Sequence, residues 1–313
     1  MKYTALDSTS LDNLQALIAK HPFLNLVSSK EVLPDSLGTG LPLIQVETTK
    51  CSALISLQGA HLLQFKTAQG NPLLWLSPNC DFTPGVALRG GVPLCLPWFG
   101  PAADDPKKPK HGFARNQFWQ LSYVQPVSDG AVELTFLLIH SADERFGYDF
   151  SAELRMTLGD SVKLELTVNN TSFTAFDCSF AFHNYFPVAQ LNGVTVPELT
   201  GRIYKDNFDN YREYTQTTTI DFTSPVDRVF PAIDSSLSIT GQYPARITHN
   251  NCPSVITWNP GFEAAGAIAD IGLGQEKYFV CVERGAVLDE KWTIPAGGKQ
   301  TAWIEFSDFF ASK

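Results

Sequence analysis

The chain has 313 residues, a length that one large β-sandwich or barrel can occupy, so length alone does not require two domains. With 44% hydrophobic and 18% charged residues, its composition is that of a globular protein and argues against extensive disorder. The net charge is -9 and the basic residues form no stripe, which argues against a nucleic-acid partner.

The amino terminus has no continuous apolar core of the kind a signal peptide needs, and no stretch approaches the roughly 20 apolar residues of a membrane span. We therefore expect a soluble cytoplasmic protein without a membrane partner. Six cysteines lie at long intervals with no C-x-x-C pair, which predicts buried free thiols rather than a disulfide framework.

The first predicted element is a short helix. Residues 11–20, "LDNLQALIAK", carry Leu11, Leu14, Leu17 and Ile18 at helical spacing, after Ser10 as N-cap and before a histidine and a proline. We expect residues 1–40 to form an N-terminal extension that contains this helix. Residues 41–313 are predicted to form a single domain.

From residue 43 onward, hydrophobic residues recur with a period of two. The alternation covers residues 44–49, 132–138, 150–158 and 161–168, and turn signals rather than long helical patterns separate the later runs. This pattern predicts an all-β fold, a large antiparallel β-sandwich.

Residues 77–116 interrupt the alternation with many prolines and glycines, as expected of an ordered, functional loop whose tip, "DDPKKPK", is a solvated turn. Arg89 and Arg115 lie in this loop, and two guanidinium groups suit a phosphate or carboxylate. The alternative is that both arginines form salt bridges with loop acids such as Asp104 and Asp105.

The segment "AFDCSFAFHNYF" at residues 175–186 places phenylalanines on one face of a strand, and His183 and Tyr185 on the other. A sheet with one packed face and one polar face suits a concave ligand site, although a solvent-facing histidine without function fits the same parity. Near the other end, the apolar strand "KYFVCVE" is expected to stop at Glu283. That carboxylate is either a paired structural charge or a site residue whose pKa burial raises.

Two other kinds of site have little support. His61, His111 and His183 could form a three-histidine metal cluster, but their separation and the lack of an H-x-H or H-E-x-x-H motif argue against it. His61 shares strand parity with Leu63 and Phe65 and is better explained as a hydrogen-bonded core or site-wall residue. A Ser/His/Asp hydrolase is disfavoured because the chain has no G-x-S-x-G motif.

Several motifs together resemble a known family. They are "RGGVPLCLPWFGP" (89–101), "HGFARNQFW" (111–119), "FHNYF" (182–186), "VDRVF" (226–230), "TWNP" (257–260) and "VCVE" (280–283). In order and spacing they resemble the hexose-6-phosphate mutarotases (glucose-6-phosphate 1-epimerases), a branch of the galactose-mutarotase-like superfamily, over about residues 42–308. The resemblance implies a large antiparallel β-sandwich.

The resemblance also implies residue roles. His183 resembles the general acid and Glu283 the general base. His111 resembles a substrate-orienting histidine and Asp227 the hydroxyl-binding aspartate, while Arg89 and Arg115 resemble the arginines that face the phosphate. No cofactor or metal is implied, and the expected partner is a small phosphosugar.

Two positions depart from the family pattern. Asp270 stands where the match is loose, so its equivalence to a family aspartate is open. Arg284 follows Glu283 where many relatives have a small residue or proline. It either pairs with Glu283 and depresses its basicity, or points away and adds to the positive field that attracts an anion.

The function that these residues favour is interconversion of the α and β anomers of a hexose 6-phosphate by a monomeric isomerase, with glucose 6-phosphate as the expected substrate. The alternatives are a mutarotase for non-phosphorylated aldohexoses and a non-catalytic carbohydrate-binding sandwich.

Overall fold

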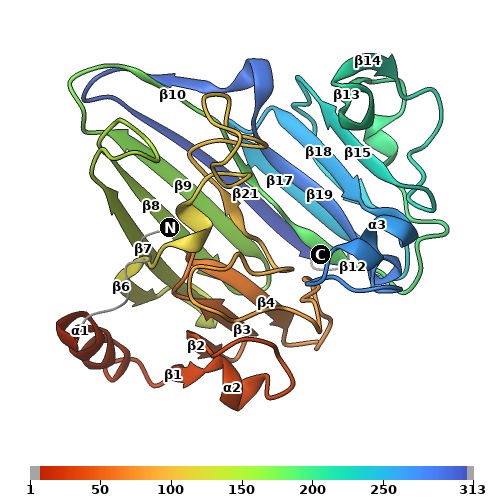
Figure 1. The fold of residues 1–313 in the computed structure, drawn as a ribbon. Helices are drawn as coiled ribbons and strands as arrows, with labels where there is room; N and C mark the ends of the chain where they lie inside the picture. Colours follow the sequence, from red (N-terminus) through yellow and green to blue (C-terminus); the bar gives the residue numbers. More distant parts are fainter. Residues whose placement is uncertain (1–7, 309–313) are drawn as a thin grey trace.

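The computed structural model describes residues 8–308 as an antiparallel β protein with few helices. Every pairing between its named strands is antiparallel, which confirms the predicted fold class. The helices of this part of the chain include α1 (Ser8–Ile18), α2 (Ser29–Val32), α3 (Gly261–Ala267) and the short 3-10 helix η1 (Ala114–Asn116). Figure 1 shows α1 far from α3, beside the edge strand β6.

The first large sheet has eight strands in the order β14-β13-β15-β18-β19-β11-β5, with β12 also pairing with β19. Its strands are β5 (Leu94–Cys95), β11 (Phe180–Phe182), β12 (Tyr185–Pro187), β13 (Ile203–Asp206), β14 (Arg212–Thr215), β15 (Val226–Phe230), β18 (Ser254–Asn259) and β19 (Phe279–Ala286).

The second large sheet has seven strands in the order β16-β17-β21-β9-β8-β7-β6. Its strands are β6 (Gln120–Pro126), β7 (Val132–His140), β8 (Phe150–Leu158), β9 (Val162–Asn170), β16 (Leu237–Ile239), β17 (Ala245–Asn250) and β21 (Lys299–Asp308). In β8 and β9 fully buried residues alternate with half-buried ones along the whole strand, as the sequence pattern predicts.

Two smaller sheets complete the fold. One has four strands in sequence order, β1 (Leu24–Ser28), β2 (Pro42–Glu47), β3 (Cys51–Ser56) and β4 (His61–Thr67). The other pairs β10 (Phe176–Cys178) with β20 (Trp292–Ile294).

The main core lies between the two large sheets. Val255 and Val282 from the eight-stranded sheet belong to the same buried cluster as Leu154 and Leu166 from the seven-stranded sheet. Removal of apolar area from water is the main stabilising term of such a sandwich. Each sheet buries one face against the other sheet, so its second face is free to carry other side chains. On the eight-stranded sheet, that other face carries the candidate site described below.

The N-terminal segment packs more closely than the sequence suggests. The predicted helix is present and ends before His21, but it already includes Ser8, so the prediction of Ser10 as N-cap is wrong. Leu14 and Ile18 are buried in the main core cluster. Residues Leu24–Ser28 then pair with β2, a strand that the sequence pattern does not indicate. The boundary at residue 40 stays a prediction.

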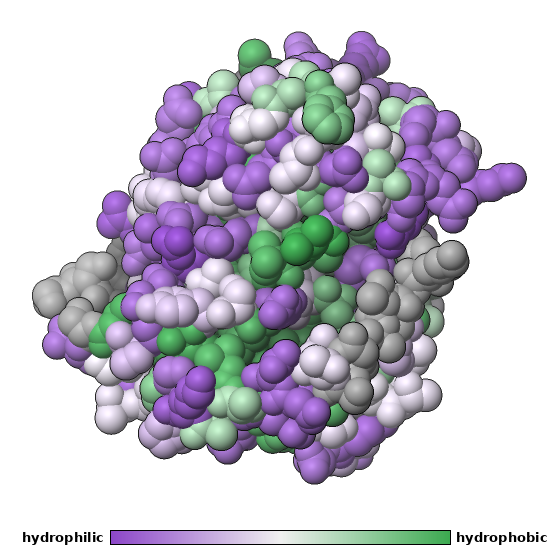
Figure 2. All heavy atoms as spheres, turned by 90° about the vertical axis from the view of Figure 1, so that its left-hand side faces the viewer, coloured by the Kyte–Doolittle hydropathy of each residue, from purple (hydrophilic) through white to green (hydrophobic). Residues whose placement is uncertain are grey.

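Figure 2 looks onto the side of the molecule that carries α1, β6 and β7. A band of hydrophobic side chains crosses this side in a hollow between hydrophilic groups. Among residues 8–308, no helix combines the length and hydrophobicity required to cross a membrane. All six cysteines are buried and unpaired, as the sequence predicts.

Candidate active site

His183 and Glu283 are brought together by strand register. In β11, Phe182 pairs with Arg284 of β19, and in β12, Tyr185 pairs with Cys281, so the register is the same on both sides of the break between β11 and β12. His183 lies in that break and therefore faces Glu283. Nδ1 of His183 and Oε1 of Glu283 are 3.3 Å apart.

Both members of this pair are buried, with exposed fractions of 7% for His183 and 1% for Glu283. Burial, then the charges of His111, Arg115 and Arg89, hold the pKa of His183 well below its usual value. Burial, then Asp227, raises the pKa of Glu283 well above that of a free carboxyl. Both shifts favour a neutral imidazole beside a protonated carboxyl. The contact does not have the geometry of a hydrogen bond, since Nδ1 has no hydrogen-bond partner.

Neighbouring strands extend the same face. Asp227 of β15 pairs with Trp258 of β18, which in turn pairs with Cys281 of β19. Asp227 accepts a hydrogen bond from Nδ2 of Asn207 (2.7 Å), and burial, followed by the charge of Asp206, raises its pKa. A carboxylate held in this way presents acceptor oxygens of the kind that sugar hydroxyls need.

Where the strand is interrupted between β11 and β12, the loop before β5 provides the main-chain hydrogen-bond acceptors. The amide of His183 donates to the carbonyl of Pro93 (3.1 Å), and the amide of Tyr185 donates to that of Gly91 (3.0 Å). The loop that carries Arg89 is thereby hydrogen-bonded to the segment that carries His183.

His111 reaches the site because Gly112 allows the chain to pass very close to the main chain of Leu96. Gly112 has φ +70°, and a Cβ atom there would lie 1.9 Å from the carbonyl oxygen of Leu96. The amide of Gly100 donates to Nδ1 of His111 (3.3 Å), and burial, with Arg115, Arg89 and Lys110, lowers the pKa of His111 to about 3. His111 is thus a neutral imidazole whose Nε2–H is available as a donor.

Arg115 follows in η1, as a partly buried cation without a carboxylate partner. It makes no ion pair with any residue from 8 to 308; its Nη2 donates to the carbonyl of Lys110 (2.9 Å), and its Nε is buried without a hydrogen-bond partner. Burial, then Arg89, lowers its pKa from the usual value. A guanidinium with so little compensation favours an incoming anion.

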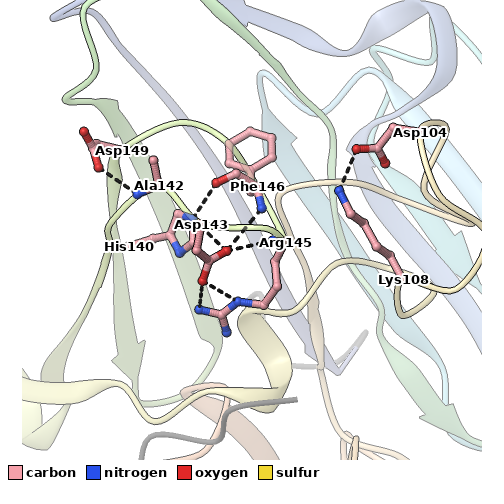
Figure 3. Close-up of polar contacts among 8 residues, drawn as sticks. All are labelled: Asp104, Lys108, His140, Ala142, Asp143, Arg145, Phe146 and Asp149. Carbon is pink, nitrogen blue, oxygen red and sulfur yellow. Dashed lines mark hydrogen bonds and ion pairs between the residues drawn. The ribbon is translucent and has the colours of Figure 1, made fainter.

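Arg89, unlike Arg115, is held by an acidic side chain and by a hydroxyl group. Its Nε lies 3.1 Å from Oδ2 of Asp270, and its Nη1 donates to the hydroxyl of Tyr185 (2.9 Å). The alternative that the loop arginines form salt bridges therefore holds for Arg89, but with Asp270 rather than Asp104 or Asp105. Asp104 pairs with Lys108 at the tip of the loop (2.6 Å). Figure 3 shows this pair apart from a second polar group around His140, Asp143 and Arg145.

One pocket of about 370 Å³ joins these groups, a size suited to a small ligand. All six residues named from the sequence line it: Arg89, His111, Arg115, His183, Asp227 and Glu283. The lining also includes Lys110, Asn207, Tyr211, Ile256, Trp258 and Ile268.

The expectation that the apolar strand stops at Glu283 is wrong, because β19 continues to Ala286. Arg284 stays in the strand and points away from Glu283, toward the core face, where it is fully buried. Its guanidinium donates to the main-chain carbonyls of Ile233, Cys252 and Ser235. These acceptors satisfy a side chain whose burial would otherwise be costly.

The three histidines do not form a cluster. His61 is fully buried and bonded through Nε2 to the carbonyl of Gly90 (2.7 Å), as expected of a hydrogen-bonded wall residue. The possible metal-ligating atoms of His183, Cys281 and Glu283 do lie within 4.8 Å of one another. The positive charges of Arg89 and Arg115 beside them make this position better suited to a negatively charged ligand than to a cation.

Some lining residues were not identified from the sequence. Tyr185, which shares strand parity with His183, does not line the pocket itself but bonds to Arg89 behind it. Trp258 lies within the "TWNP" motif. Asn207 and Tyr211 belong to the irregular turn between β13 and β14, where consecutive residues Asn210 and Tyr211 have positive φ, and no local pattern marks them as site residues.

Comparison with known proteins places the chain in a family. Residues 42–307 match the family model described as aldose 1-epimerase. A protein of Escherichia coli named "Putative glucose-6-phosphate 1-epimerase" is 37% identical over 78% of this chain and 82% of its own length, and one of Cenchrus ciliaris with the same name is 34% identical over 76% and 75%. The crystal structure of a "putative mutarotase (YeaD) from Salmonella typhimurium" superposes with a TM-score of 0.79 at 33% identity, over 85% of this chain and 90% of that one. The chain therefore belongs to the aldose 1-epimerase family of isomerases.

Proposed function

We propose that this protein interconverts the α and β anomers of a hexose 6-phosphate, with glucose 6-phosphate as the expected substrate. The observation that carries the proposal is that Arg115, a partly buried cation without a carboxylate partner among residues 8–308, lines the same pocket as the His183–Glu283 pair. The names of the bacterial and plant relatives point to the same substrate class.

Anomerisation needs an acid and a base that act on neighbouring atoms. One group removes the proton of the C1 hydroxyl while the other protonates the ring oxygen, and after rotation about C1–C2 the two steps reverse. Because both oxygens are bonded to C1, the acid and the base must lie close together. The 3.3 Å contact between His183 and Glu283 meets this requirement.

The pair needs one transferable proton. In the proposed cycle His183 donates to the ring oxygen and Glu283 accepts from C1–OH, so that ring opening leaves a neutral imidazole and a protonated carboxyl. The electrostatics of the free site favour that same arrangement. A bound phosphate would offset the charges of Arg115 and Arg89 and so favour proton return to His183.

The remaining polar groups suit substrate orientation. Asp227 would accept hydrogen bonds from ring hydroxyls, and the neutral His111 would donate from Nε2 to a substrate oxygen. Arg115 and Arg89 would bind the phosphate. No metal or cofactor enters these steps. A monomeric state and a cytoplasmic location remain predictions from the sequence.

Magnetisation-exchange NMR between the anomeric protons of glucose 6-phosphate tests the proposal, with glucose at equal concentration as the comparison. We expect the protein to accelerate exchange in the phosphosugar well beyond the spontaneous rate and to act much more weakly on glucose. Equal acceleration of both sugars would support a mutarotase for free aldohexoses, and no acceleration of either would contradict the proposal.

A further inference from the structure

We propose that Tyr185 is a positioning residue that mechanically couples Arg89, at the anion end of the pocket, to the imidazole of His183, while Asp270 holds Arg89 from the other side. The inference rests on the proposed function, because it assigns Arg89 to the phosphate and His183 to proton transfer.

The first link is a guanidinium held at two of its nitrogens. Nε of Arg89 is 3.1 Å from the carboxylate of Asp270, and Nη1 donates to the hydroxyl of Tyr185 at 2.9 Å. Asp270 is itself fixed, because its main-chain carbonyl accepts from the hydroxyl of Ser77 (2.6 Å). An anion that binds Arg89 must compete with, or share, the contacts to Asp270 and Tyr185.

The second link is a ring stack. The rings of Tyr185 and His183 are nearly parallel, with an interplanar angle of 7° and centroids 4.8 Å apart. Tyr185 is buried, and it also packs against Trp75 (5.9 Å) and Phe279 (5.2 Å). In a closely packed region a side chain of this size has little freedom to move independently of its neighbours. A displacement at the Tyr185 hydroxyl is therefore transmitted to the His183 ring.

The consequence is a connection between the two ends of the substrate. Binding of the phosphate to Arg89 alters the hydrogen bond to Tyr185, and the stacked imidazole responds at the position where the ring oxygen is protonated. A non-phosphorylated sugar occupies the same pocket without producing this response. Discrimination between the two sugars then appears in the proton-transfer step as well as in binding.

The closing experiment follows the ¹⁵N-labelled imidazole of His183 by NMR while inorganic phosphate is added to the full-length protein. The resonances are assigned by their loss in His183→Asn. In the wild type we expect phosphate to shift them. In Tyr185→Phe, which keeps the ring and removes the hydroxyl, phosphate should still bind while the His183 shift is largely lost. Tyr123→Phe is the matched control, because Tyr123 is exposed and its hydroxyl donates to Gln125 on the same strand.

An equal phosphate-induced shift in Tyr185→Phe and the wild type would overturn the coupling while leaving the proposed function intact. Failure of the wild type to bind phosphate would contradict the anion site itself, and this inference with it. The two failures are therefore distinguishable.

Asp270→Asn tests the other side of Arg89 by kinetics. Without the competing carboxylate, Arg89 should be free to bind the phosphate more closely, so KM for glucose 6-phosphate should fall. Because Arg89 then loses its fixed position, kcat should also fall about tenfold. Asp270→Glu should restore kcat in part. Unchanged KM and kcat in Asp270→Asn would overturn the role of Asp270, and a simple folding defect would not lower KM.

Discussion

His183 and Glu283 face one another at 3.3 Å although they lie far apart in the chain, because the pairing of β19 keeps one register from β11 to β12. Arg115 opposes the upward shift in the pKa of Glu283, but burial is the larger effect. Burial disfavours the charged form of both groups, and in the neutral pair that it favours the carboxyl holds a proton that the imidazole can receive.

Glu283→Gln and His183→Asn should each lower kcat for glucose 6-phosphate by about 10²-fold or more, because each removes one half of the proton transfer. Magnetisation-exchange NMR measures the rate. The double variant should be little worse than either single variant, since the two groups act as a unit. Glu276→Gln is a control, because Glu276 is also buried but does not line the pocket. Wild-type rates in either single variant would remove that residue from the mechanism.

Arg115→Met should make the free protein more stable, by about 1–2 kcal/mol, because it removes a poorly compensated cation from a partly buried position. The same change should abolish the thermal stabilisation by inorganic phosphate that we expect in the wild type. Scanning calorimetry with and without phosphate measures both effects. A loss of stability in the free protein, together with normal phosphate stabilisation, would contradict the assignment of Arg115 to the anion.

His61 should make the protein sensitive to acid. Burial, offset in part by the bond to Gly90, lowers its pKa from 6.5 to about 3 in the folded state. Between these values the unfolded chain binds a proton that the folded chain does not, so stability falls as the pH drops from 6.5 toward 3. The loss attributable to this group is roughly 4 kcal/mol. Urea unfolding of the wild type and His61→Gln across this range measures it, and equally steep curves for both would contradict the prediction.

Arg284→Met should destabilise the protein by about 3 kcal/mol or more, because three main-chain carbonyls, two of them in buried contacts, lose their donor. The rate per folded molecule should change little, since the side chain lies on the face of β19 opposite the pocket. Arg246→Met, at an exposed position in β17, is the matched control and should cost far less. Urea unfolding gives the stability, and a selective fall in kcat would show that Arg284 influences Glu283 after all.

Gly112→Ala should displace His111 and destabilise the fold by more than about 2 kcal/mol, because the added Cβ meets the Leu96 carbonyl in a left-handed turn. Gly70→Ala is the matched control: its φ is +83°, but no atom lies within 4 Å of the added Cβ, so only the backbone strain of about 1 kcal/mol applies. Thermal unfolding compares the two variants. Equal losses would mean that the close crossing at Leu96 is not the limiting contact.

The sheets were predictable where one face is buried and the other is not. In β8 and β9 strict alternation reflects that asymmetry, so the period of two in the sequence suffices to identify them. By contrast, β1 is short and irregularly buried, and its pairing with β2 depends on tertiary contacts that no local pattern encodes.

The site was predictable in its residues but not in its arrangement. Motif resemblance supplied the six lining residues, whereas the contact between His183 and Glu283 depends on a register that only the assembled sheet defines. The predicted strand end at Glu283 is wrong because an arginine inside an apolar strand usually marks its end, whereas Arg284 continues β19. Its acceptors, the carbonyls of residues 233, 235 and 252, come from distant loops.

The hydrogen bonds from His183 to Pro93 and from Tyr185 to Gly91 have a consequence for how the chain can vary in length. An insertion between Arg89 and β5 would shift these acceptors and separate the groups at the two ends of the pocket. Residues 103–107 at the tip accept no such bonds, because the contacts of Asp104 and Asp105 are to Lys107 and Lys108 nearby in the chain. Loop exchange or tag insertion is therefore best directed to the tip, a few residues beyond a stretch that tolerates no change of length.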